Sequence, residues 1–262
     1  MLMHSMLALG TLSLLHRPFP SLNEEINPSP NLTTILITAA LVEAFLLYFC
    51  KSHPRQSLLL SCNLSNDSSK TLADLPKAEN SRLILVKLDI AIESGPDTAV
   101  ETLRKEHGIE SLDVVVVNAG ISKEAKLVKE SSVATVQLLK ASKSGRPTFV
   151  AITSLFRTIG DLEYFKSWPP ILGPYGASKA ALNWFMRRIH FEEGWLINFV
   201  LSPGLVQTHM AQETFTGNGV DASQFDVIMV EQSATDLAER ITTATKENGG
   251  TFRDHDGKPL PW

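Results

Sequence analysis

The chain has 262 residues, of which 44% are apolar and 20% charged, and its formal net charge is −4. This length is enough for one domain with a full hydrophobic core, and the apolar fraction is too high for a disordered chain. The negative net charge argues against nucleic acid as the main partner. The chain has only two cysteines and no zinc-ligand spacing, so we expect neither a disulfide framework nor a metal site. Nothing in this composition requires an oxidising compartment, and we expect a cytoplasmic protein.

Residues 1–30 differ in character from the rest of the chain. After an apolar run at 6–15 they are irregular and contain several prolines. No Lys or Arg precedes that run, so it does not match the charged start of a secretory signal peptide. We therefore predict an irregular leader over residues 1–30 and a single domain over residues 31–262.

A second apolar run, residues 35–50, raises the question of a membrane span. It contains Glu43 and is shorter than the about twenty apolar residues that a spanning helix needs. We predict instead a buried strand that continues into a buried helix, and no membrane partner. A membrane anchor formed by residues 32–50 is the weaker alternative.

From residue 32 onward, short apolar runs alternate with helical segments. Strands are predicted at 34–38, 57–62, 82–88, 113–117, 148–153 and 196–201, and helices at 40–49, 96–107, 175–191 and 231–247. Short, branched, apolar strands that alternate with helices are typical of a parallel sheet buried on both faces. The predicted fold class is therefore α/β, with a doubly wound parallel sheet covered by helices on both sides.

Small or polar residues follow three of the predicted strands. The segments are Asn118-Ala119-Gly120, Thr153-Ser154 and Ser202-Pro203-Gly204. In open parallel sheets, ligands bind beyond the carboxyl ends of the strands. We expect these three loops to meet at one edge of the sheet and to form the site there.

The segment 175–179 combines a tyrosine with a lysine at helical spacing. Residues four apart lie on the same helix face, so the Lys179 ammonium should lie one turn from the Tyr175 phenol. A nearby positive charge should lower the phenol pKa from about 10 and allow proton exchange with a carbonyl or alcohol oxygen. Ser154 could hold that oxygen by a hydrogen bond. Taken alone, such a Tyr–Lys pair is more often an exposed helix face.

The context of this pair favours a site. VVVVNAGISKE lies upstream, a strand that ends in Ser lies between, and SPGLVQT lies downstream of YGASKAALN. By these ordered motifs the chain is identified as a member of the short-chain dehydrogenase/reductase family, over about residues 32–262. Together with the tail GGTFRDHDGKPLPW, the motifs resemble the fungal norsolorinic acid ketoreductase branch. The resemblance implies a Rossmann-type fold.

The resemblance also implies a role for particular residues. Tyr175 matches the family's general acid and base, Lys179 its partner, and Ser154 the hydroxyl that orients the substrate. The implied cofactor-binding residues are Asp89, Asn118, Tyr175, Lys179, Val206 and Thr208. The implied reaction is hydride transfer from NADPH, with NAD less favoured, to a ketone such as an aromatic polyketide. Members of the family usually pair through helices, so a homo-oligomer is one alternative and the oligomeric state stays open.

The chain departs from the family pattern in its first half. The glycine-rich turn expected after the first strand is missing, because no glycine occurs between Gly10 and Gly95. Such glycines let the backbone turn tightly around a pyrophosphate. No basic residue follows the strand at 57–62 at the position that would bind an NADP phosphate. The stretch from Asn118 to Ser154 is also short, and the family's Asn-Val-x-Gly segment is missing from it.

These departures leave two interpretations open. One is an active ketoreductase with an abbreviated first βα turn and an abbreviated region before Ser154. The other is a non-catalytic family member that acts as a binding subunit. The missing glycine turn favours the second, and the intact set Ser154, Tyr175 and Lys179 favours the first.

Several other residues have simple structural interpretations. We expect His209 to be a surface residue and Asp254-His255-Asp256 to be a solvated loop rather than a metal site. We expect Leu182, Phe185, Met186 and Ile189 to face the core. Tyr164, Phe165 and Trp168 could either pack within their loop or cover an aromatic substrate.

Overall fold

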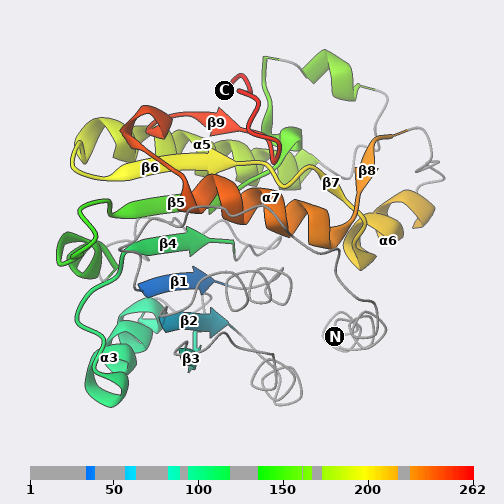
Figure 1. The fold of residues 1–262 in the computed structure, drawn as a ribbon. Coiled ribbons are helices and arrows are strands. Elements are labelled where there is room, and N and C mark those ends of the chain that lie inside the picture. The colour runs from blue at the N-terminus through cyan, green and yellow to red at the C-terminus, as the bar shows by residue number, and fades with distance from the viewer. Residues whose placement is uncertain are drawn as a thin grey trace, which may run out of the picture.

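The computed structural model describes residues 34–38, 57–62, 82–88, 94–118, 135–160, 162–166, 173–217 and 225–262. The strands of the main sheet are β1 (Thr34–Thr38), β2 (Ser57–Cys62), β3 (Arg82–Lys87), β4 (Val114–Val117), β5 (Thr148–Ile152), β6 (Ile197–Leu201) and β9 (Phe252–Arg253). They form one seven-stranded sheet in the order β3-β2-β1-β4-β5-β6-β9. Every neighbouring pair is parallel (Figure 1). The predicted doubly wound parallel sheet is confirmed.

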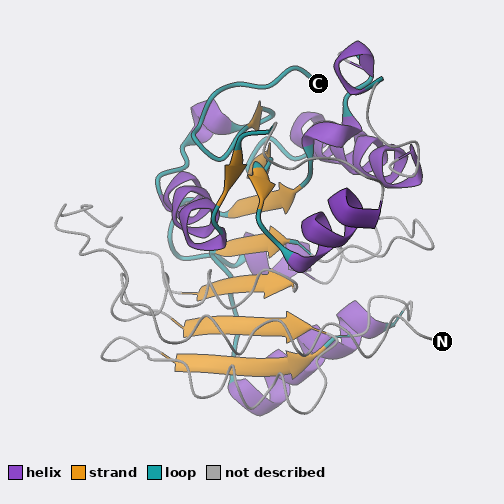
Figure 2. Cartoon of the chain, turned by 90° about the vertical axis from the view of Figure 1, so that its right-hand side faces the viewer, coloured by secondary structure: helices purple, strands orange, loops and turns teal. Residues whose placement is uncertain are grey.

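Helices cover both faces of this sheet. They are α3 (Gly95–His107), α5 (Gly173–Glu192), α6 (His209–Gly217) and α7 (Val230–Thr242), with short 3-10 helices η1 (Leu155–Arg157), η2 (Leu162–Phe165) and η5 (Lys246–Asn248). Figure 1 shows α7 in front of β5 and α5 behind β6, and the turned view of Figure 2 shows helices on either side of the strands. A two-stranded sheet of β7 (Leu205–Val206) and β8 (Val227–Ile228) lies beside α6.

The central strands are buried on both faces, which explains their composition. Every residue of β5 and of β6 is buried, as are the first three residues of β4. Side chains of a strand alternate between the two faces, so a strand covered on both sides must be apolar throughout. Met186 of α5 is buried in the same core cluster as Phe149 and Val200, and Leu182 and Ile189 pack at its margin, as the helical spacing predicted. Phe185, which the same spacing placed in the core, is only half-buried and packs edge to face against the exposed Trp184.

A buried carboxylate joins the amino ends of the central strands. Asp113, just before β4, accepts hydrogen bonds from the Thr34 backbone N–H at 2.9 Å and from the Ser142 hydroxyl at 2.6 Å. The Ser144 N–H also donates to it, at 3.3 Å. The side chain is completely buried. These donors compensate for the loss of water around the charge, so the carboxylate ties β1 and β4 to the loop that precedes β5.

Most predicted elements agree with the structure to within one or two residues. The final helix was predicted too long: α7 ends at Thr242 and η5 follows as a separate turn. The hydroxyls of Thr242 and Thr243 donate back to the carbonyls of Ala238 and Glu239, and such bonds compete with continued helix. The sequence analysis missed α6, β7, β8 and β9.

Some predictions lie outside the described residues. They are the leader 1–30, the helix at 40–49 and the expected site of the glycine-rich turn. In the described ranges, no helix is long and apolar enough to cross a membrane.

Replacing Asp113 by Ala should lower the free energy of unfolding by about 2–4 kcal/mol, because the buried Thr34 donor and the half-buried donors of Ser142 and Ser144 lose their acceptor. Urea unfolding measures this loss. The control is Glu110→Ala, a carboxylate three residues away that is exposed and should change stability by less than about 0.5 kcal/mol. Equal effects of the two substitutions would contradict the assigned role of Asp113.

Candidate active site

The candidate site lies at the carboxyl edge of the main sheet. Asn118 directly follows β4, Ser154 follows β5 by two residues, and Ser202 directly follows β6. Because β4, β5 and β6 are adjacent and parallel, these three chain segments leave the sheet at the same edge. The three strand ends therefore lie at one edge of the sheet, as predicted, while Ala119 and Gly120 of the first loop lie outside the described residues.

Ser154 sits where the chain turns from β5 into η1. Its backbone is extended, and its hydroxyl accepts a hydrogen bond from the Phe156 N–H at 3.3 Å, which caps the short helix. The same hydroxyl lies beside the Tyr175 phenol of α5 and acts on its pKa. Its position is thus set from two sides, by the turn of η1 and by α5.

A glycine allows α5 to approach η1 closely. A Cβ placed at Gly176 would lie 2.5 Å from the Phe156 carbonyl oxygen, a distance that real Cβ atoms do not reach. The rings of Phe156 and Tyr175 meet edge to face, with their centroids 6.5 Å apart. The residue next to Tyr175 therefore determines how near the phenol comes to Ser154. The sequence analysis missed this role, although a glycine inside a helical pattern is a recognised sign of close packing.

Lys179 lies one helical turn beyond Tyr175, as predicted. Its Nζ donates to the Ile152 carbonyl at 3.2 Å, across from α5 to the last residue of β5. The same Nζ is 5.7 Å from the centroid of the Tyr175 ring. An ammonium has three donors, so the side chain can keep this anchor and still bind another acceptor at the edge of the sheet.

Burial dominates the electrostatics of this pair. Desolvation raises the pKa of the Tyr175 phenol above its ordinary value, and the hydrogen bond from Ser154 opposes that shift. Desolvation also lowers the pKa of the Lys179 ammonium. The net shift of the phenol pKa is therefore upward, opposite to the direction that the Tyr–Lys spacing predicted, because burial disfavours the charged form. At neutral pH the Tyr175 phenol keeps its proton and is a hydrogen-bond donor.

Two of the predicted cofactor residues lie on the segment that follows β6. Val206 belongs to β7, and its carbonyl accepts a hydrogen bond from the Thr208 N–H at 2.8 Å. The Thr208 hydroxyl accepts from the Ala211 N–H at 3.2 Å and caps α6. A hydroxyl that accepts one bond still has a proton to donate, so Thr208 fits a ligand with an acceptor at this edge.

Other predicted residues fall outside what the structure describes. Asp89 and the whole of Trp168 are among them, as are the side chains of Tyr164, Phe165 and His209. Asn118 is described, and it is half-buried. Across the described part of the chain, no three His, Cys, Asp or Glu side chains gather as metal ligands.

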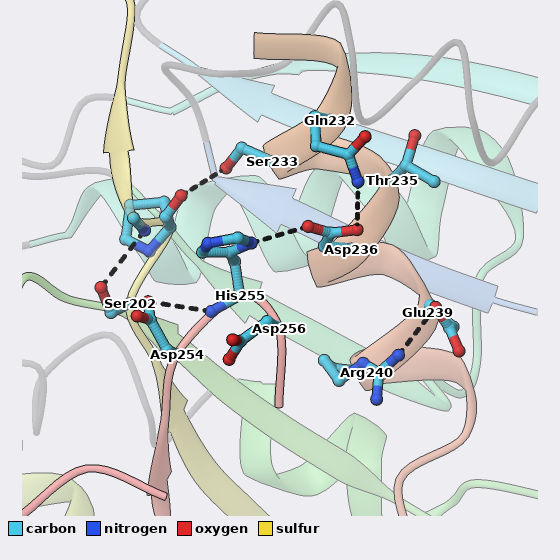
Figure 3. A network of polar contacts seen from close by, with 12 residues as sticks. Ser202, Gln232, Ser233, Thr235, Asp236, Glu239, Arg240, Asp254, His255 and Asp256 are labelled. Carbon is cyan, nitrogen blue, oxygen red and sulfur yellow. Dashed lines mark hydrogen bonds and ion pairs between the residues drawn. The ribbon is translucent and has the colours of Figure 1, made fainter. Parts of the chain in front are cut away.

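The prediction for the loop 254–256 was wrong at its middle residue. His255 is not solvated: its side chain is only 19% exposed, and its Nδ1 lies 2.6 Å from Asp236 of α7 (Figure 3). By contrast, the exposed Asp256 pairs with Lys258 within its own loop. Sequence reasoning could not find the first contact, because Asp236 and His255 belong to different elements.

Comparison with known proteins decides the family. Norsolorinic acid ketoreductase nor1 of Dothistroma septosporum is 36% identical over 281 residues, which cover 97% of this chain and 98% of that protein. The chain belongs to the short-chain dehydrogenase/reductase family. The norsolorinic acid ketoreductase of Aspergillus parasiticus is 33% identical, over 89% of this chain and 92% of that protein. Short-chain dehydrogenase RED3 of Pyricularia oryzae is 31% identical, over 88% of this chain and 98% of that protein. No family model matches the chain.

Solved structures agree with this short-chain dehydrogenase/reductase fold. NADPH-bound carbonyl reductase from chicken fatty liver superposes with a TM-score of 0.70 at 19% identity, over 88% of this chain and all of that chain. Carbonyl reductase Sniffer of Drosophila melanogaster superposes with a TM-score of 0.66 at 18% identity, with the same coverage of this chain.

The alignment with the Dothistroma relative is longer than this chain itself, so that relative contains segments that this enzyme lacks.

Replacing Gly176 by Ala should displace η1, because the new methyl group would collide with the Phe156 carbonyl. We expect a stability loss of about 1–3 kcal/mol by urea unfolding, together with lower activity as Ser154 moves away from Tyr175. Gly173→Ala is the matched control, since that glycine starts the same helix and a Cβ there meets nothing within 4 Å. Wild-type stability of the Gly176→Ala variant would contradict the close approach.

The phenol of Tyr175 should ionise above pH 10, its ordinary value, because burial raises its pKa. Ultraviolet difference titration of the wild type against Tyr175→Phe isolates this one phenol among the three tyrosines. Far-ultraviolet circular dichroism at each pH confirms that the fold persists. An ionisation step below pH 10 would show that Lys179, rather than burial, dominates.

Proposed function

We propose that this enzyme is an NADPH-dependent ketoreductase. The observation that carries the proposal is the half-buried phenol of Tyr175, which keeps its proton, lies beside Ser154 and has Lys179 one turn away. A ketone that accepts a hydride becomes an alkoxide and needs a proton. A protonated phenol beside a hydroxyl suits the reduction of a ketone, because it supplies a proton where negative charge develops.

The proposed mechanism assigns one task to each side chain. A bound nicotinamide cofactor would supply the hydride. The Ser154 hydroxyl donates a hydrogen bond to the ketone oxygen and orients it. Tyr175 gives its proton to that oxygen as charge develops there. The resulting phenolate is stabilised by the positive charge of Lys179, because the single Ser154 proton is already donated to the substrate oxygen.

The described residues fit the nicotinamide half of a dinucleotide. Lys179 has donors beyond the one it uses on Ile152, and the Thr208 hydroxyl has a proton to donate. We assign Lys179 to the ribose and the segment from Val206 to Thr208 to the carboxamide side. Asn118 and Asp89 are assigned to the adenine side on the family resemblance alone.

The preference for NADPH over NADH rests on the resemblance to the ketoreductase branch. Cys62 is the last residue of β2, and it has no charge with which to bind a 2′-phosphate. The phosphate would therefore need a cation from another segment. Separate titrations with NADPH and NADH decide this point.

We further propose that the substrate is a ketone of an aromatic polyketide. Relatives that span most of the chain are named norsolorinic acid ketoreductases. The chain after η1 also presents Ile159 and Leu162, which are 78% and 59% exposed and follow Ser154 closely. Exposed apolar side chains next to a site favour an apolar ligand over a sugar or an amino acid.

The test combines cofactor binding with turnover. NADPH fluorescence titration of the folded chain should show saturation at micromolar concentration, and a panel of aromatic ketones should reveal a substrate. Tyr175→Phe should lower kcat by about 10²–10⁴-fold, because the substitution removes the hydroxyl group that supplies the proton.

Two results would contradict the proposal. Turnover retained by Tyr175→Phe would exclude the phenol as proton donor. A folded chain that binds neither NADPH nor NADH at millimolar concentration would instead favour the non-catalytic interpretation.

A further inference from the structure

The turn after β9 docks against α7 through one side chain. The turn is closed by hydrogen bonds from the Asp254 N–H to the Lys258 carbonyl and from the Gly257 N–H to the Asp254 carbonyl, each 2.9 Å long. His255 lies within it, and Figure 3 shows its ring extending toward α7. The chain terminus is thus attached to a helix on one face of the central sheet.

Asp236 of α7 holds the His255 ring in a defined orientation. Its carboxylate lies 2.6 Å from His255 Nδ1 and accepts a second bond from the Gln232 side chain at 2.7 Å. A carboxylate only accepts hydrogen bonds, so Nδ1 must have the proton. The opposite edge of the ring, with Cδ2 and Nε2, is then directed away from α7.

That opposite edge packs against the turn between β6 and β7. A Cβ at Gly204 would lie 2.8 Å from His255 Cδ2 and 3.3 Å from Nε2. Gly204 has a φ of +76°, a backbone conformation that residues other than glycine rarely adopt. The ring therefore occupies the space beside the glycine and blocks movement of the turn in that direction.

The same turn has a second attachment to α7. The Ser233 hydroxyl donates to the Pro203 carbonyl at 2.7 Å, and the Ser202 hydroxyl accepts from the Gly204 N–H at 3.3 Å (Figure 3). Ser233 and Asp236 are three residues apart and so share one helix face. One face of α7 thus contacts the turn twice, directly through Ser233 and indirectly through Asp236 and His255.

We propose that His255 and Asp236 are positioning residues for the cofactor loop. They hold the turn at Gly204 so that Val206 and Thr208, two and four residues further on, meet the nicotinamide in a fixed place. The expected effect on NADPH binding rests on the proposed function. The rigidity of the turn is a property of the chain itself and can be measured without any cofactor.

Three variants separate the hydrogen bond between His255 and Asp236 from the contact of the His255 ring with Gly204. His255→Ala removes both the hydrogen bond and the ring. His255→Asn keeps a donor near the position of Nδ1 but lacks the ring edge that faces Gly204. Asp236→Asn keeps an amide oxygen that can accept the hydrogen bond from the histidine, so this conservative variant should hold the turn as the wild type does. The control is Asp256→Ala, because Asp256 belongs to the same turn but is exposed and pairs with Lys258.

The first readout is hydrogen–deuterium exchange of residues 204–208 in the cofactor-free protein. We expect roughly tenfold faster exchange in His255→Ala and His255→Asn, and near wild-type rates in Asp236→Asn and Asp256→Ala. The second readout is NADPH binding and kinetics. The dissociation constant and KM for NADPH should rise roughly tenfold in the two histidine variants, while the KM for the ketone stays unchanged.

The outcomes distinguish the inference from the proposed function. Unchanged exchange in His255→Ala, or equal acceleration in Asp256→Ala, would overturn the positioning role. Faster exchange with unchanged NADPH affinity would confine the pair to a structural role and also overturn it. If the histidine variants exchange faster than the wild type, but the wild type itself binds no NADPH, the proposed function is overturned and the attachment of the turn is still established.

Discussion

Parallel pairing of β4, β5 and β6 is the constraint on which the candidate site depends. Because these strands run in one direction and are neighbours, the chain must leave each of them at the same edge of the sheet. Residues far apart in sequence, Asn118, Ser154 and Ser202, therefore follow adjacent strand ends. Burial of β5 and β6 on both faces keeps these strands in the centre of the sheet, beneath helices on each side.

The chemistry of the site follows from close packing rather than from charge alone. Gly176 lets α5 approach the Phe156 carbonyl, and this approach half-buries Tyr175 and brings its phenol next to Ser154. Desolvation then favours the neutral phenol and opposes the charge on Lys179. An acid that keeps its proton at neutral pH is suited to reduction, where the developing alkoxide takes that proton.

The C-terminal segment contacts two sides of the site at once. Buried Arg157, three residues after Ser154, donates to the Pro261 carbonyl and stacks over the Phe252 ring at 3.9 Å from its centroid. His255 of the same segment packs against Gly204. The end of the chain therefore supports both the segment that presents Ser154 and the turn that leads to Thr208, a long-range dependence within one enzyme of this family.

The sequence by itself determined the class of the fold and the chemical groups of the site. Branched apolar strands between helices specify a parallel sheet, and the helical spacing of Tyr175 and Lys179 places them on one face, because both patterns are local. Only the tertiary structure decided the direction of the phenol's pKa shift, since burial depends on what packs against it. It also decided the fate of His255, which looked like a residue of a solvated loop and is held by Asp236 from another element. The short strands β7 and β9 were also decided only by the tertiary structure, because pairing with β8 and β6, and not the pattern of their own two residues, makes them strands.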